Sequence, residues 1–310
     1  MSGKATSLQA FMTQQLKEMG QNIAANLNKN MEARRGNPFL PIDETINRCM
    51  GLGRSTDSQL GNRMQNIIFY AARLKYGDQA VPNIVAIEPD EQAKTVKCVC
   101  YYVELADYEL AFGKKSGGFK QNAFKQIVFV NKKIDEQAAA KILKLPEKDT
   151  IQSYETVFTA VSGKAFGYLK KYASKLKIET DLLIFETGDP IQIRTFEIKL
   201  GGSLDTKNAP ANIREITALK ELFAFSKRNH TYFATCYGNG SEAVARSFDK
   251  TKKPFDRRDG ILKNTEFWEV VLPAEIPYPD FIRMYQEAFQ QANIDETLKK
   301  LSGMKEPPGD

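Results

Sequence analysis

Three charged residues stand at the ends of two apolar runs in the segment Thr180–Leu200, whose sequence is TDLLIFETGDPIQIRTFEIKL. The runs have the length and composition of buried strands, and the Gly-Asp-Pro sequence between them favours a tight turn. Asp181 heads the first run, and Glu197 and Lys199 lie near the end of the second. Ionised groups rarely occupy such positions unless they are paired or bind a metal. These three residues are therefore the first candidates for chemistry.

Strand geometry predicts that the three side chains meet. Glu197 and Lys199 are two residues apart, so in a strand they point to the same face. If the two runs pair as a hairpin centred on Asp189, position 181 falls opposite position 197. The two carboxylates and the amine then lie together at the end of the hairpin farthest from the turn.

This grouping suits metal-dependent phosphodiester hydrolysis. Two carboxylates a few ångströms apart repel each other, and a divalent cation removes that conflict. Oxygen ligands that are few and leave room for water suit Mg²⁺, which can activate a water and stabilise charge on a phosphoryl oxygen. Lys199 would orient or deprotonate that water and offset the developing charge. The alternative interpretation is a buried ion pair with one further carboxylate at the strand edge.

Other chemistries find little support in the sequence. The chain has one histidine, His230, which leaves His-based triads and His-rich zinc sites poorly supplied. Cys98 and Cys100 alternate along an expected strand without a second pair, and we expect both in the core. Four cysteines in 310 residues are too sparse for a disulfide framework and fit a reducing cytoplasm.

Composition and charge set wider limits. With 42% hydrophobic and 26% charged residues, the chain has the composition of a soluble globular protein. No apolar run approaches the roughly 18 residues of a membrane span, and the N-terminus lacks the apolar region of a signal peptide. The net charge of +6 permits a polyanionic partner. Basic residues cluster in two segments, GKKSGGFK (113–120) and DKTKKPFDRRDG (249–260).

Hydrophobic spacing predicts helices in the first quarter of the chain. Apolar residues three and four positions apart predict an amphipathic helix over about 7–34. A second helix is expected over about 55–76, with Ser55 and Ser58 near its start and Gly77 at its end.

The rest of the chain alternates strands with helices. Three strands between 83 and 132 predict a meander with one covered face, and a helix is expected at 136–143. The later predicted elements are a helix at 152–172, strands at 180–186 and 191–200, a helix at 209–225, a strand at 231–237 and a closing helix at about 279–301. The order α-β-β-α-β predicts an α/β fold with a mixed central sheet flanked by helices.

We expect an N-terminal helical region plus the small β-meander in residues 1–150 and the core with the closing helix in residues 151–310, or one compact subunit that contains both. The candidate site belongs to the second part.

The order of several segments resembles the PD-(D/E)xK nuclease superfamily. Asp181 is followed about sixteen residues later by Glu197-Ile198-Lys199 within the α-β-β-α-β block. Further segments resemble, within that superfamily, a group of type II restriction endonucleases that cut GG-N-CC sites: NPFLP (37–41), STDSQLGNRMQNIIFYAARL (55–74), GGSLDTKNAPAN (201–212) and EFWEVV (266–271). Thr180 stands where the superfamily has its proline, which leaves Glu179 as an alternative first acid.

The resemblance implies a homodimeric, Mg²⁺-dependent endonuclease of the prokaryotic cytoplasm that acts on double-stranded DNA beside a cognate DNA methyltransferase. A two-fold dimer matches a palindromic site, with each subunit cutting one strand. Glu155, expected on the preceding helix, is a further candidate metal ligand. The candidate DNA contacts are Lys207, Asn208, Asn212, Arg214, Lys252, Lys253, Arg257 and Arg258.

Two other functions remain open at this stage. One is a repair or structure-specific nuclease on the same scaffold, because a fold does not fix a substrate. The other is a DNA-binding protein without catalysis, which predicts binding with no Mg²⁺-dependent cutting.

Overall fold

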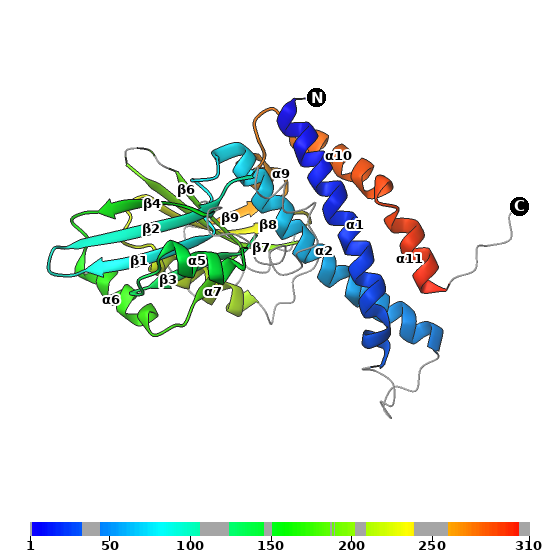
Figure 1. Ribbon diagram of the computed structural model, residues 1–310, viewed down its shortest axis with the longest axis horizontal. Coiled ribbons are helices and arrows are strands. Elements are labelled where there is room, and N and C mark those ends of the chain that lie inside the picture. Colours follow the sequence, from blue (N-terminus) through cyan, green and yellow to red (C-terminus); the bar gives the residue numbers. More distant parts are fainter. Residues whose placement is uncertain are drawn as a thin grey trace, which may run out of the picture. The chain divides into compact units, whose positions relative to one another are not determined.

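A computed structural model of the chain describes residues 2–32, 44–105, 124–145, 151–186, 188, 190–201, 209–238 and 260–303 (Figure 1). Its elements in chain order are α1 (Gly3–Glu32), α2 (Glu44–Tyr76), β1 (Ile84–Asp90), β2 (Thr95–Val103), β3 (Gln126–Val130), α5 (Glu136–Leu143), β4 (Ile151–Phe158), α6 (Gly163–Ala173), β5 (Ile178–Thr180), β6 (Leu182–Glu186), β7 (Gln192–Lys199), α7 (Ala209–Leu222), β8 (Asn229–Thr235), β9 (Ile261–Lys263), α9 (Thr265–Val271), α10 (Tyr278–Gln291) and α11 (Ile294–Ser302). These elements form the predicted α/β fold, with two mixed sheets rather than one.

The chain divides into two compact units. The helical unit comprises Met1–Ile68 and Pro273–Asp310, and the sheet unit comprises Phe69–Leu272. This division differs from the predicted boundary near residue 150. The strands on either side of that boundary belong to one sheet, because β4 pairs with β2 and β5 pairs with β3.

The helical unit is built on the apolar face of α1. Six apolar residues with the predicted spacing of three and four positions are all at most 2% exposed: Leu8, Met12, Leu16, Met19, Ile23 and Leu27. Helices α10 and α11 lie along α1 (Figure 1). The predicted single closing helix is wrong, because Asn293 adopts a left-handed φ of 52° and separates α10 from α11. Asparagine tolerates this conformation because its short side chain can hydrogen-bond locally.

Helix α2 begins earlier than predicted and ends where predicted. It starts at Glu44, so Ser55 and Ser58 are interior residues and do not cap it. Ser55 is buried in this helix, and burial of that face outweighs the local preference of serine for a helix start. At the other end, Gly77 has φ 87° and its N–H donates to the Arg73 carbonyl at 2.8 Å. A glycine in the left-handed conformation is a common helix stop.

Sheet A has the strand order β4-β2-β1-β3-β5. Strand β1 is antiparallel to β2 and parallel to β3, so the predicted simple meander is wrong. The predicted helix at 152–172 is also wrong in its first half, where Ile151–Phe158 forms strand β4 and only Gly163–Ala173 is helical. Tyr154 and Phe158 are four residues apart, a spacing that places them on one face of either a helix or a strand.

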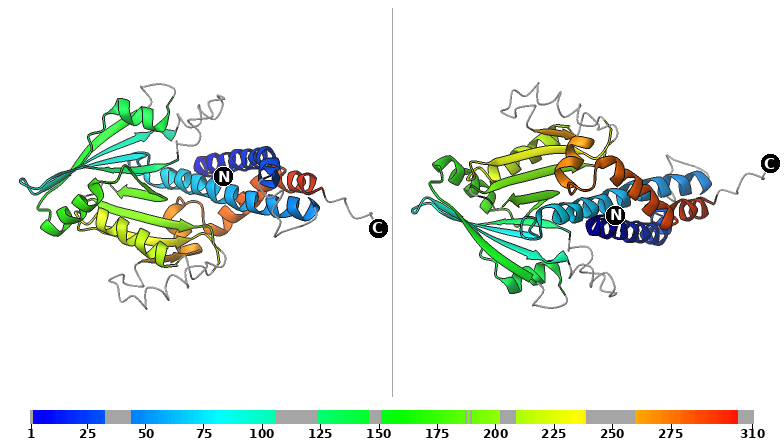
Figure 2. Two further views of the ribbon diagram at one scale, coloured as in Figure 1. Left: turned by 90° about the horizontal axis from the view of Figure 1, so that it is seen from below. Right: turned by 90° about the horizontal axis from the view of Figure 1, so that it is seen from above.

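Sheet B has the order β6-β7-β8-β9 and carries the candidate hairpin. Strands β6 and β7 are antiparallel, whereas β7, β8 and β9 run parallel. Helix α7 connects β7 to β8, as the crossover between parallel strands requires. Figure 2 shows the strands of the two sheets as separate layers of the sheet unit.

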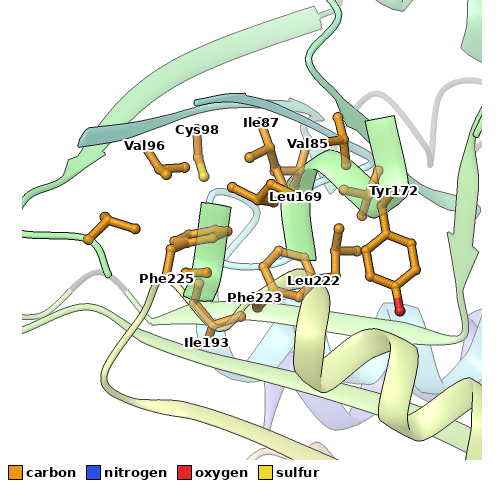
Figure 3. Packing of buried hydrophobic residues seen from close by; sticks show 14 of the residues in the cluster. Val85, Ile87, Val96, Cys98, Leu169, Tyr172, Ile193, Leu222, Phe223 and Phe225 are labelled. Atoms are coloured by element: carbon orange, nitrogen blue, oxygen red, sulfur yellow. The ribbon is translucent and has the colours of Figure 1, made fainter. Parts of the chain in front are cut away.

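The core of the sheet unit is formed by side chains of both sheets, of α6 and of the end of α7 (Figure 3). Side chains of sheet A, including Cys98, face Leu169 and Tyr172 of α6, and Phe223 and Phe225 lie beyond that helix. The predicted burial of Cys98 and Cys100 is confirmed, and all four cysteines are free. None of the helices in the described ranges has the combination of length and apolar character that crossing a bilayer requires.

Candidate active site

The hairpin of β6 and β7 has the predicted register. Leu182 pairs with Phe196, and continuing the pairing by one residue places Asp181 beside Glu197. Asp181 is the one residue between β5 of sheet A and β6 of sheet B, so it stands where the chain passes from one sheet to the other. One of its carboxylate oxygens accepts the Ile198 backbone N–H at 2.7 Å, which holds the acid against the end of β7.

Glu197 and Lys199 form an ion pair on the same face of β7. The Lys199 Nζ lies 2.5 Å from a Glu197 carboxylate oxygen, and the two side chains are 34% and 12% exposed. The parallel pairing places Thr235 of β8 beside Lys199 on this face. The prediction that spacing brings Asp181, Glu197 and Lys199 together is therefore realised in the structure.

The electrostatics of this group favour an additional positive charge. The pKa of Glu197 is raised to about 7, chiefly by burial and next by the neighbouring Asp181, against the opposing effect of Lys199. Burial likewise raises the pKa of Asp181, although the Ile198 N–H and Lys199 oppose that shift. Burial alone would lower the pKa of Lys199, but the surrounding carboxylates outweigh it and raise that pKa. Lys199 therefore stays protonated. Its single positive charge does not fully compensate the two carboxylates.

Glu215 of α7 is a fourth charged residue of the site that the sequence did not single out. Its carboxylate acts electrostatically on Asp181, Glu197 and Lys199, although Glu215 itself is exposed. The signal that points to it is topological. A helix that follows a strand and returns along it places its first turns near the carboxyl end of that strand.

The site offers few protein ligands to a metal ion. No group of three or more His, Cys, Asp or Glu side chains arranged to hold a metal occurs in the part of the chain that the structure describes. Asp181 and Glu197 supply two carboxylates, and Mg²⁺ commonly takes one or two carboxylates and keeps several waters. The residues present therefore fit a hydrated Mg²⁺, and they do not form an all-protein cage.

Backbone contacts fix the end of β7. The Cys236 and Tyr237 N–H groups donate to the Lys199 and Leu200 carbonyls at 3.1 Å each. Gly201 follows with φ 140°, and a Cβ there would lie 2.2 Å from the Tyr237 carbonyl oxygen, so only glycine fits. Burial raises the pKa of the Cys236 thiol to about 12, with a contribution from Asp181, so this cysteine is a packed residue and not a nucleophile.

Two buried polar atoms near this face have no hydrogen-bond partner among the described residues. They are the Thr235 Oγ1, in a residue that is 0% exposed, and the Asn212 Nδ2, in a residue that is 5% exposed. Asn212 lies one turn before Glu215 on α7. Unpaired buried groups are costly, by about 1–3 kcal/mol each. Thr235 belongs to β8 and Asn212 to α7, which also carries Glu215. Each atom can therefore still form a hydrogen bond.

Glu155 and Glu179, the other predicted acids, lie elsewhere. Glu155 is on strand β4 and not on a helix, its side chain is 60% exposed, and it pairs with Lys97 at 3.4 Å. Strands β4 and β5 form opposite edges of sheet A, roughly 19 Å apart at the usual strand spacing. Glu179 pairs with Lys177 at 2.5 Å on β5. Neither acid joins Asp181 and Glu197.

The predicted DNA contacts are only partly described. Arg214 is exposed on α7, whereas Asn212 is buried, so its amide does not lie on the surface. The remaining predicted contacts lie outside the described residues: Lys207, Asn208, Lys252, Lys253, Arg257 and Arg258.

Comparisons with known proteins give no match. No family model, no curated protein and no solved structure is similar to this chain. The chemistry of the site is therefore the basis for assigning a function.

Proposed function

We propose that this protein is a Mg²⁺-dependent endonuclease that hydrolyses phosphodiester bonds in double-stranded DNA. The observation that supports this proposal is the grouping of Asp181, Glu197 and Lys199 at one end of the β6–β7 hairpin. Two half-buried carboxylates with raised pKa values and an adjacent amine constitute a site that is short of positive charge. A divalent cation and a phosphate ester together would meet that need.

Each residue has a separate task in this proposal. Asp181, oriented by the Ile198 N–H, and Glu197 would hold the metal. Bound Mg²⁺ supplies activation of water and stabilisation of charge on the phosphoryl group. Lys199 donates hydrogen bonds to the phosphoryl oxygens and offsets their charge, because its raised pKa keeps it protonated. A raised pKa of Lys199 favours its charge-offsetting role over deprotonation of the water.

We further propose that the enzyme is a type II restriction endonuclease of the PD-(D/E)xK superfamily. Its homodimer would cut a palindromic, GG-N-CC-like site beside a cognate methyltransferase. The support is the order of segments that resembles this group, together with the mixed sheet on which the candidate residues lie. A two-fold dimer suits a palindrome because each subunit meets an equivalent strand.

The test is to incubate the purified protein with a sequenced plasmid, with Mg²⁺ or with EDTA, and to map the ends of the fragments. Discrete fragments that form only with Mg²⁺ and end at one symmetric site are expected. Nonspecific degradation would indicate a nuclease of the repair type, and intact DNA bound without cutting would indicate a DNA-binding protein.

Matched variants locate the activity. Glu197→Gln should abolish cutting, whereas Glu186→Gln should leave it intact. Glu186 is the appropriate control because it lies in the same hairpin at the turn end, where it pairs with Arg194 at 3.1 Å. Cutting that survives Glu197→Gln would place the active site elsewhere.

A further inference from the structure

A hollow between α1 and α2 of the helical unit is lined only by polar and basic side chains. Its volume is about 290 Å³. The lining residues are Asn26 and Lys29 of α1 and Arg54, Ser55, Ser58 and Gln59 of α2. Neither a carboxylate nor an apolar side chain is among them, so every lining side chain offers a hydrogen-bond donor.

The positions of these residues follow from helical spacing. Asn26 and Lys29 are three residues apart, and Arg54 and Ser58 are four apart, so each helix presents its members on one side. A hydrogen bond links the two walls, since the Asn22 amide donates to the Gln59 side-chain oxygen at 3.4 Å. That bond uses the Gln59 oxygen, so the amide nitrogen of this lining residue can still donate.

Polar contacts further along the same two helices hold the walls together. Gln15 of α1 accepts from Asn66 of α2 at 2.8 Å, and Arg63 of α2 pairs with Glu18 of α1 at 3.0 Å. The apolar face of α1 is buried in the same unit. The lining residues therefore stand on a braced helix pair, which keeps the donors in place before a ligand arrives.

The lining selects an anion. Lys29 and Arg54 bring two positive charges, and within the described ranges neither forms an ion pair. Pockets for small organic ligands are mostly apolar with a few polar groups, and this hollow has the opposite character. Contacts to DNA phosphates come from Arg, Lys, Ser, Asn and Gln side chains, which are the residue types present here.

We propose that this hollow binds a backbone phosphate of duplex DNA and so gives the helical unit a DNA contact of its own. The choice of DNA as the source of the phosphate rests on the proposed function. Neither helix begins at the hollow, so backbone N–H groups of a helix N-terminus do not contribute. Binding there depends on the side chains, and substitutions should remove it.

The test measures binding of the full-length protein to a 30-bp duplex, in EDTA, over a series of salt concentrations. Each phosphate contact contributes about 0.9 to the slope of log affinity against log salt. Lys29→Ala with Arg54→Ala removes the one proposed phosphate contact and should therefore reduce that slope by about 0.9 and weaken binding. The control is Lys17→Ala with Lys300→Ala, which removes the same charge from exposed positions outside the hollow of the same unit.

The outcomes are distinct. A smaller slope in the Lys29/Arg54 variant and an unchanged slope in the control support the proposal. Equal changes in both variants indicate general electrostatic attraction and overturn it, as does an unchanged slope in both. Stabilisation by inorganic phosphate that depends on Lys29 and Arg54, without any change in DNA binding, indicates a free-phosphate site and also overturns it.

The binding test in EDTA and the cleavage test with Mg²⁺ together separate this inference from the proposed catalysis. If the unsubstituted protein binds duplex DNA through Lys29 and Arg54 but never cuts it with Mg²⁺, the phosphate site stands and the nuclease proposal fails. If the protein cuts DNA and the double substitution leaves the salt slope unchanged, the nuclease proposal stands and the phosphate site fails.

Discussion

The sheet unit shields charged side chains from solvent in two places, and the two are built differently. Arg73 is 1% exposed, and its guanidinium donates to the carbonyl oxygens of Val81 and Val103 and to the Asn83 side chain, with Asp78 as its ion-pair partner. The group at Asp181, Glu197 and Lys199 instead keeps two carboxylates whose pKa values are raised. Complete pairing is typical of a structural charge, and incomplete compensation is typical of a functional site.

The largest expected effect is on catalysis, through the group at Asp181, Glu197 and Lys199. Asp181→Asn or Glu197→Gln removes a proposed metal ligand, and metal catalysis of phosphoryl transfer contributes several kcal/mol, so cutting should fall about 10³-fold or more. The rate of plasmid cleavage at saturating Mg²⁺ measures this. Circular dichroism should show an unchanged fold, and a variant that cuts at near-normal rates would contradict the assignment.

Arg73 should show the reverse pattern, with a large effect on folding. Arg73→Ala removes the guanidinium that donates to Asp78, Asn83 and two carbonyl groups, and removal of one partner from a buried pair costs about 3–5 kcal/mol. Urea unfolding of the variant measures the loss. Arg283→Ala, which removes an exposed arginine paired with Asp280, should change the free energy of unfolding by about 0.5 kcal/mol or less. Equal losses of unfolding free energy in the two variants would contradict the structural role assigned to Arg73.

The raised pKa of Glu197 predicts a pH-dependent stability. Its folded pKa of about 7 lies above the ordinary value of 4.5, so its contribution is present below pH 4.5 and is lost as pH rises through 7. That difference corresponds to about 3 kcal/mol. In EDTA, the free energy of unfolding of the natural protein should fall relative to Glu197→Gln between pH 4.5 and 8. Parallel curves for the two proteins would show that Glu197 ionises normally.

The smallest expected effects concern Thr235 and Thr195, which lie on the face of sheet B that carries Glu197 and Lys199. Thr235→Val removes a buried hydroxyl without a partner among the described residues, so stability should rise by about 1 kcal/mol. Thr195→Val breaks the 2.9 Å hydrogen bond to Thr231, so stability should fall by about 1 kcal/mol. Thermal unfolding of both variants measures the difference, and a loss for Thr235→Val would mean that its hydroxyl is bonded in the folded protein.

The accuracy of prediction from sequence varied with the range of the interaction. The hairpin register was predictable because the turn and the alternation of side chains are local properties. The helical start of 152–172 was mispredicted because the spacing of Tyr154 and Phe158 satisfies both periods. Pairing with β2 makes the segment a strand, and that partner lies some fifty residues away in the sequence.

The sequence by itself determined that Asp181, Glu197 and Lys199 meet, because a hairpin register and a two-residue strand period are sufficient for that result. It also determined the buried face of α1 through helical spacing. Only the tertiary structure decided that Glu215 acts on this group while Glu155 stands on the opposite edge of sheet A. Those placements depend on how helices and strands distant in the sequence pack together, which local spacing does not encode.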